Sequence, residues 1–183
     1  MIGGMDAVGV AERADRIIAV RNTAAATDAL IECGLVAVRE VQAWADAQHA
    51  ALVAKLSADG FTEDTIARAA KTSLGAAAKS TQRAKTLGVT PNLAEALGDG
   101  QTTAGHVDAL TRAGAQLPPA QRDKLFERVD ALADVAAAST VEQFSRRVAL
   151  EAKQIQSDDG IDRLTRQRSN VRASHWVDSD GMW

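Results

Sequence analysis

The sequence has few of the residues that mark disulfide-rich, aromatic-cored or membrane-embedded proteins. Its 183 residues include one cysteine, three prolines and no tyrosine, and aromatic residues make up 3%. A single cysteine, Cys33, excludes an internal disulfide framework and fits a reducing compartment. No stretch approaches the roughly 18 apolar residues of a membrane span, and the first residues lack the pattern of a secretory signal. We therefore expect a soluble, cytoplasmic protein with no membrane partner.

The signatures of catalysis are absent as well. The sequence has no glycine-rich phosphate loop, nucleophile elbow or Cys-x-x-Cys pair, and scattered glutamates show no paired metal-ligand spacing. The three histidines, His49, His106 and His175, stand far apart without neighbouring ligands. We interpret His49 and His106 as packing or capping residues. The chain is predicted to contain no catalytic residue, no metal ligand and no cofactor site.

Alanine is abundant, and it has the best intrinsic helix propensity. Apolar residues recur at helical spacing, which predicts a mainly α-helical, multi-helix bundle over residues 1–169. The predicted helices cover residues 6–22, 27–60, 62–70, 74–87, 117–137 and 140–158, with a short basic helix at 161–168. In the second of these, Ile31, Leu35, Val38, Ala45, Leu52 and Leu56 form a stripe. Its heptad-like spacing suits either an internal core or pairing with another helix.

Residues 90–110 predict a fixed corner between two short helices. Thr90 is expected to cap the first helix and Pro91 to be its first residue. Gly98 and Gly100 end that helix, because glycine accepts positive φ angles without strain. Thr102 or Thr103 is then expected to cap the second helix.

The helices at 62–70 and 74–87 have the outline of a helix-turn-helix. No Asp or Glu occurs between residues 65 and 94. The same segment contains five cations, which are Arg68, Lys71, Lys79, Arg83 and Lys85. Such a face suits phosphate contact, whereas the alternative is a solvated basic surface. The start of the second helix has few base-reading side chains, which favours phosphate contact over sequence-specific reading.

A second basic cluster lies near the C-terminal end of the sequence. Arg163, Arg166, Arg168 and Arg172 would form another phosphate-facing patch, or they would pair with nearby acids. Beyond them, residues 170–183 predict the start of a β-hairpin, with its turn at 178–181. Half a hairpin is not stable alone, so we expect the protein to continue into a further C-terminal region.

The segments LGDGQTTAGHVDAL and RSNVRASHWVDSDGMW, with a Leu-Pro-Pro helix start between them, resemble the domain of unknown function 222. This family is also called the 13E12 repeat family and is widespread in actinobacteria. The resemblance extends from about Ala24 to Trp183. The positions that match best are Leu97, Gly100, His106, Val107 and Leu110, together with Asp180, Gly181 and Met182. The turn at 71–73 is more polar than the resemblance leads us to expect.

Members of that family commonly carry an HNH endonuclease domain, with a metal site that cuts DNA, after this region. The resemblance implies that this chain is the non-catalytic N-terminal domain of such a protein. None of the nuclease residues can be placed here, and a divalent metal would belong to the missing nuclease domain. Our leading hypothesis is a domain that binds or positions duplex DNA. The alternative is a helical scaffold for dimerisation or protein interaction, with a homodimer as its simplest form.

Overall fold

The structure is a computed structural model that describes residues 5–60 and 62–170. In this part of the chain it consists of nine helices and contains no strand. The helices are α1 (Ala7–Asn22), α2 (Asp28–Ala58), α3 (Glu63–Ala70), α4 (Leu74–Val89), α5 (Pro91–Gly98), α6 (Ala104–Gly114), α7 (Pro119–Asp130), α8 (Ala133–Ala137) and α9 (Val141–Asn170). The mainly α-helical class is therefore confirmed. The β-hairpin predicted at 170–183 lies outside the described residues, apart from Asn170, which ends α9.

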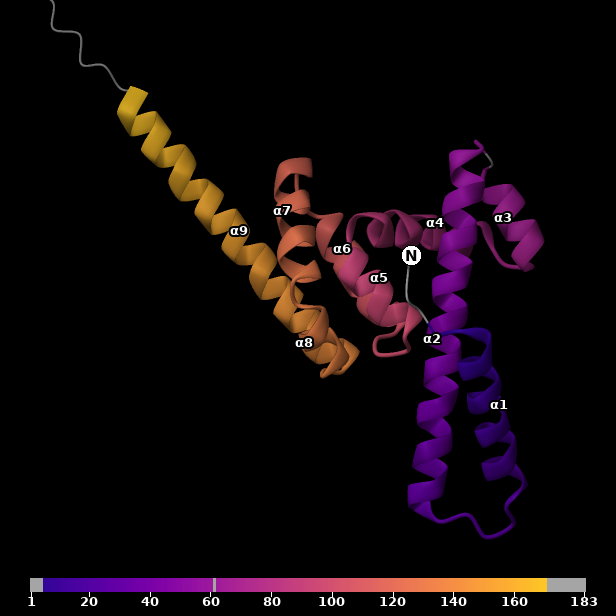
Figure 1. Ribbon diagram of the computed structural model, residues 1–183. Helices are drawn as coiled ribbons and strands as arrows, with labels where there is room; N and C mark the ends of the chain where they lie inside the picture. The colour runs from indigo at the N-terminus through magenta and orange to yellow at the C-terminus, as the bar shows by residue number, and fades with distance from the viewer. Residues whose placement is uncertain (1–4, 61, 171–183) are drawn as a thin grey trace, which may run out of the picture.

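The helices are arranged from α1, α2 and α3 at one end of the molecule to α9 at the other, with α4–α8 between them (Figure 1). Helix α2 packs against α1, α4 and α5, and α9 packs against α6, α7 and α8. Helix α1 lies along the N-terminal half of α2, where a Cβ added to Gly34 would stand 3.1 Å from Val20. We refer to α1 together with residues 28–39 of α2 as the arm, because the two helices project from the rest of the molecule (Figure 1).

The core runs from α2 through α4, α5 and α6 to α7 and α9. Its largest side chains are almost fully buried, and they are Val53, Leu93, Leu97, Val107, Leu110, Leu125, Val129, Phe144, Val148 and Ile155. Burying each such side chain stabilises the fold by roughly 1.5–3 kcal/mol. Fully buried alanines, such as Ala77 and Ala136, let neighbouring helices approach closely.

Two predicted helix boundaries are wrong. The single helix predicted for 117–137 is split into α7 and α8, because Leu132 leaves helical geometry at φ −106° and ψ 22°. The stop predicted at 158–160 does not occur, and α9 continues through Gly160 to Asn170. A glycine inside a helix costs only about 1 kcal/mol, and an ion pair from Arg128 to Asp158 helps to hold this part of α9 in place.

The corner between α5 and α6 forms as predicted, but its capping differs. Pro91 is the first residue of α5, as expected. The Thr90 hydroxyl does not cap α5, because it donates to the carbonyl of Thr86 at 2.9 Å. Asp130 of α7 caps α5 instead, where its Oδ1 accepts the backbone N–H of Leu93 at 3.0 Å. This cap comes from a residue distant in sequence.

The glycines of the corner have different roles. Gly98 is the last residue of α5 and has no positive φ, whereas Gly100 has a φ of +75°. Gly100 also lies against α2, where an added Cβ would stand 2.9 Å from both Cα and Cβ of Glu40. Thr103, not Thr102, caps α6. The corner is therefore docked on α2 through a position that has no space for a side chain.

Helices α3 and α4 form the predicted pair around a turn at residues 71–73. Lys71 has a left-handed conformation with a φ of +52°, and the Ser73 hydroxyl caps α4 by accepting from the N–H of Ala76. Within α4, Ala77, Thr81, Ala84 and Leu87 are buried at the predicted spacing. Leu74, which was predicted to face the core, is 59% exposed.

The apolar stripe of α2 lies mostly at the surface. Its spacing suited either an internal core or pairing with another helix, and Ile31, Leu35 and Leu52 are 44%, 63% and 60% exposed, so these residues do not lie in the core. The buried positions of α2 are Gly34, Ala37, Ala43, Ala50 and Val53. Helices α1, α4 and α5 pack on the faces of α2 that flank the stripe.

Over the described ranges, none of the helices has the length and apolarity needed to cross a membrane.

Candidate nucleic-acid interface

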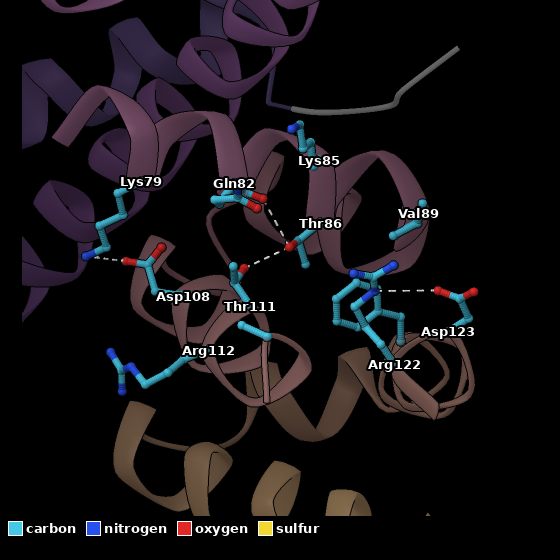
Figure 2. Close-up of a pocket in the computed structure, with 12 residues that line it drawn as sticks. Lys79, Gln82, Lys85, Thr86, Val89, Asp108, Thr111, Arg112, Arg122 and Asp123 are labelled. Carbon is cyan, nitrogen blue, oxygen red and sulfur yellow. Dashed lines mark hydrogen bonds and ion pairs between the residues drawn. The ribbon is translucent and has the colours of Figure 1, made fainter. Parts of the chain in front are cut away.

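Helices α4, α6 and α7 enclose an open groove of about 520 Å³ (Figure 2). Its cationic side chains are Lys79 and Lys85 from α4, Arg112 from α6 and Arg122 from α7. Two carboxylates, Asp108 and Asp123, also line it. We refer to this site as the α4/α6/α7 groove. Its volume is in the range of about 300–1,000 Å³ that is typical of ligand sites.

Asp108 anchors one wall of the groove. Arg83 donates to it twice, from Nε to Oδ1 at 2.9 Å and from Nη2 to Oδ2 at 2.9 Å. Lys79 Nζ lies 2.8 Å from the same Oδ2. Burial alone would raise the pKa of Asp108, but these hydrogen bonds outweigh it and hold the pKa below its usual value. Asp108 is therefore an ionised, doubly paired carboxylate that joins α6 to α4.

The sequence pattern predicted that Arg83 contacts phosphate on an exposed basic face of α4, with a solvated face as the alternative, but the structure holds its side chain in ion pairs between helices. Its side chain is only 13% exposed, and besides Asp108 it contacts Asp46 of α2 at 3.6 Å. Arg83 of α4 is therefore joined to α6 by a bidentate pair with Asp108 and to α2 by its contact with Asp46. The segment without acidic residues gave no indication of this, because both carboxylates come from other helices.

The other residues predicted to contact DNA are dispersed. Arg68 is 74% exposed and pairs with Asp64 at 3.7 Å, and neither Arg68 nor Lys71 lines the groove. Lys79 and Lys85 line it, and Lys79 remains 60% exposed despite its pairing. Lys85 is exposed and makes no ion pair with any residue that the structure describes. The side chains of Arg163, Arg166 and Arg168, and all of Arg172, lie outside the described part of the chain.

Two cations of the groove were not predicted. Arg112 is in the last turn of α6, is exposed and has no ion-pair partner among the described residues. Among the described residues, Arg122 forms an ion pair with its neighbour Asp123 alone, with 3.7 Å between Nε and Oδ1. Residues 109–122 contain no acidic residue, but these two arginines are the only cations there and stand ten residues apart, so the charge pattern did not single them out. Only the packing of α6 and α7 beside α4 brings them to the same groove.

Polar groups lie between these cations. The Oγ1 atoms of Thr86 and Thr111 are 2.8 Å apart and share a hydrogen bond between α4 and α6 (Figure 2). The groove as a whole is lined by four cationic groups and two carboxylates, although the chain carries a net charge of −3. The arrangement therefore concentrates positive charge and hydroxyl groups in one concave surface of an acidic protein.

His106 holds α6 in position behind the groove. It is 4% exposed, and its Nδ1 accepts the N–H of Thr103 at 3.2 Å. The opposite nitrogen, Nε2, therefore carries the proton and donates to the carbonyl of Ser139 at 3.1 Å. The ring also packs on Phe144, with 5.3 Å between centroids. His106 is thus a capping and packing residue, in agreement with the interpretation from sequence.

Across the residues that the structure describes, no cluster of three or more His, Cys, Asp or Glu side chains is placed to hold a metal ion. Comparison of the chain with family models, with curated proteins and with solved structures finds no match. The resemblance to the domain of unknown function 222 therefore stays a prediction from the sequence.

Proposed function

We propose that the chain is a non-catalytic helical domain that engages the phosphate backbone of duplex DNA through the α4/α6/α7 groove. The observation that carries this proposal is that Lys85 of α4 and Arg112 of α6 line one groove, are exposed and have no ion-pair partner in the part of the chain that the structure describes. The resemblance to nuclease-associated proteins points in the same direction. On this proposal, the chain positions DNA for a metal-dependent nuclease domain elsewhere in the same protein.

The chemistry of the groove suits a phosphodiester. Phosphate oxygens accept hydrogen bonds from Lys, Arg, Thr and Gln side chains, and all four types line the groove. Neutralising phosphates releases condensed counterions, so binding should weaken as salt rises. The cations without ion-pair partners are not at the N-terminus of α4, where a recognition helix would read bases. We therefore expect little dependence on DNA sequence.

The test compares two double variants that remove the same charge. Lys85→Ala with Arg112→Ala removes the two groove cations for which the described residues provide no ion-pair partner. Arg16→Ala with Arg21→Ala removes two exposed cations of α1, far from the groove, as the matched control. Binding to a short duplex is measured by fluorescence anisotropy between about 50 and 200 mM salt. We expect the groove variant to lower the salt slope by about 2 and the control to leave it unchanged.

Equal binding by the groove variant and the wild type would refute the assignment of the groove. No salt-dependent binding by the wild type would refute DNA engagement itself. Replacing Arg83 is unsuitable for this test, because it would leave the buried carboxylate of Asp108 with one partner fewer and destabilise the fold. A weaker signal from that variant would not distinguish lost phosphate contact from lost structure.

A further inference from the structure

The exposed stripe of α2 has the spacing of a coiled-coil seam. Its positions alternate strictly between steps of four and three residues. They are Ile31, Leu35, Val38, Gln42, Ala45, His49, Leu52 and Leu56, and we refer to these eight residues as the seam. The seam extends over nearly four heptads, or about 37 Å of helix. A single helix packed only into its own domain has no need of so regular a heptad.

The seam is open along most of its length. Five of its members are exposed, namely Ile31, Leu35, Gln42, Ala45 and Leu52. Val38 and His49 are half-buried. Only Leu56, at the C-terminal end, packs against the core. The two surfaces that α2 does bury, around Gly34 and around Ala50, lie on either side of the seam.

The arm buries little apolar surface within this chain. Helix α1 contains no buried residue, although it has 16 residues. It packs mainly on α2, and the ion pair of Arg13 with Glu40 adds little beyond that contact. Most helical stability in proteins comes from packing an apolar face, so a two-helix arm with an open seam is marginal alone.

We propose that a second copy of this chain covers the seam, with the two α2 helices antiparallel about a two-fold axis near Ala43 and Trp44. The alternating steps of four and three residues read the same from either end of the seam. Pairing about this axis therefore places the first apolar position of each heptad, called a, opposite the second, called d, of the other copy. Leu35 then faces Leu52 of the second copy, and Ile31 faces Leu56. Val38 faces His49, and Gln42 faces Ala45. Each pair occurs twice, as a two-fold interface requires.

The charge of the arm also favours a second copy over a partner of opposite charge. Residues 7–39 contain four acidic and four basic side chains, so the arm has no net charge that would repel residues 48–56 of the second copy, which it faces in this register. An acidic or basic helix of another protein would meet no net charge of opposite sign on the arm. This inference is independent of the proposed DNA contact, because no seam residue lines the α4/α6/α7 groove.

The first experiment measures the mass of the full chain by sedimentation over a roughly hundredfold concentration range. We expect the wild type to be a dimer and the variant Leu35→Glu with Leu52→Glu to be a monomer with unchanged helicity. The control carries Leu74→Glu with Leu150→Glu, which replaces two leucines that are 59% and 61% exposed outside the seam. It should remain a dimer. A monomeric wild type, or a seam variant that still dimerises, would overturn the proposal.

The second experiment tests the antiparallel register by oxidative cross-linking. In a Cys33→Ser background, Leu35→Cys with Leu52→Cys should form covalent dimers, whereas Leu35→Cys alone should not. Cross-linking of the single variant would show that Leu35 faces its own counterpart, which is a parallel pair and contradicts the two-fold antiparallel arrangement. The DNA-binding test uses different variants, Lys85→Ala with Arg112→Ala. Its failure would leave the sedimentation and cross-linking results unaffected, so the two proposals can fail separately.

Discussion

Replacing either of two glycines by alanine should separate backbone strain from packing in this fold. Gly100 and Gly60 have nearly the same left-handed backbone, with φ angles of +75° and +81°. Their surroundings differ completely. A Cβ at Gly60 meets nothing within 4 Å, whereas a Cβ at Gly100 stands 2.9 Å from the Cα of Glu40. Gly60→Ala is therefore the matched control for Gly100→Ala.

The expected magnitudes follow from these two observations. A side chain in the left-handed region costs about 1–2 kcal/mol, offset in part by about 0.4–1 kcal/mol of reduced unfolded-state entropy. Gly60→Ala should therefore lower the free energy of unfolding by about 1 kcal/mol. Gly100→Ala carries the same strain and also forces the corner away from the α2 backbone, which adds about 1–3 kcal/mol of overpacking. Its total loss should be about 2–4 kcal/mol.

The assay is urea unfolding of the wild type and both variants, followed by circular dichroism. At about 2–4 °C of melting temperature per kcal/mol for a chain of this size, Gly100→Ala should also melt about 4–16 °C lower. Equal losses in the two variants would refute the close contact between the corner and Glu40. A larger loss for Gly60→Ala would refute the reasoning altogether.

Three further predictions concern residues that join helices. His106→Ala leaves the Thr103 N–H and the Ser139 carbonyl unpaired, so urea unfolding should show a loss of about 2–4 kcal/mol; an unchanged midpoint would contradict it. Asp130→Ala removes the cap of α5 and should cost about 1 kcal/mol in the same assay, whereas Thr90→Val, which changes no cap, should leave the N-terminus of α5 protected in hydrogen exchange. The fold lowers the pKa of Asp108, so the ionised carboxylate contributes to the free energy of unfolding. This contribution is complete above the pKa of the unfolded chain, about 4, and is lost as pH falls through the lowered pKa of the folded state. The stability gap between the wild type and Asp108→Asn should therefore shrink from neutral pH to below about pH 4, and a constant gap would contradict the pairing.

Much of the fold could be predicted because helix ends are local. The capping box of α9 forms as the sequence indicates, with Thr140 N–H donating to Gln143 Oε1 at 3.0 Å and Gln143 N–H to Thr140 Oγ1 at 3.3 Å. Pro91 and Pro119 are placed in the first turns of α5 and α7. These signals act over three or four residues, so the sequence alone is sufficient to read them.

The candidate site could be predicted only in part. Lys79 and Lys85 were identified from an acid-free segment and do line the groove. Arg83 came from the same segment, yet it is bound to Asp108 and Asp46, which are distant in sequence. Arg112 completes the groove from another helix. Charge in a sequence window counts residues on one element, whereas a binding surface is assembled from several.

The helical class, most helix starts and the heptad period of α2 can therefore be read from the sequence. Which helix faces are covered depends on the tertiary packing. A period of apolar residues indicates that a stripe will be buried, but it does not say by what. In this chain, α1, α4 and α5 cover the faces of α2 beside the seam, and Ile31, Leu35 and Leu52 are left at the surface. That choice depends on contacts between residues far apart in the chain, which no local pattern contains.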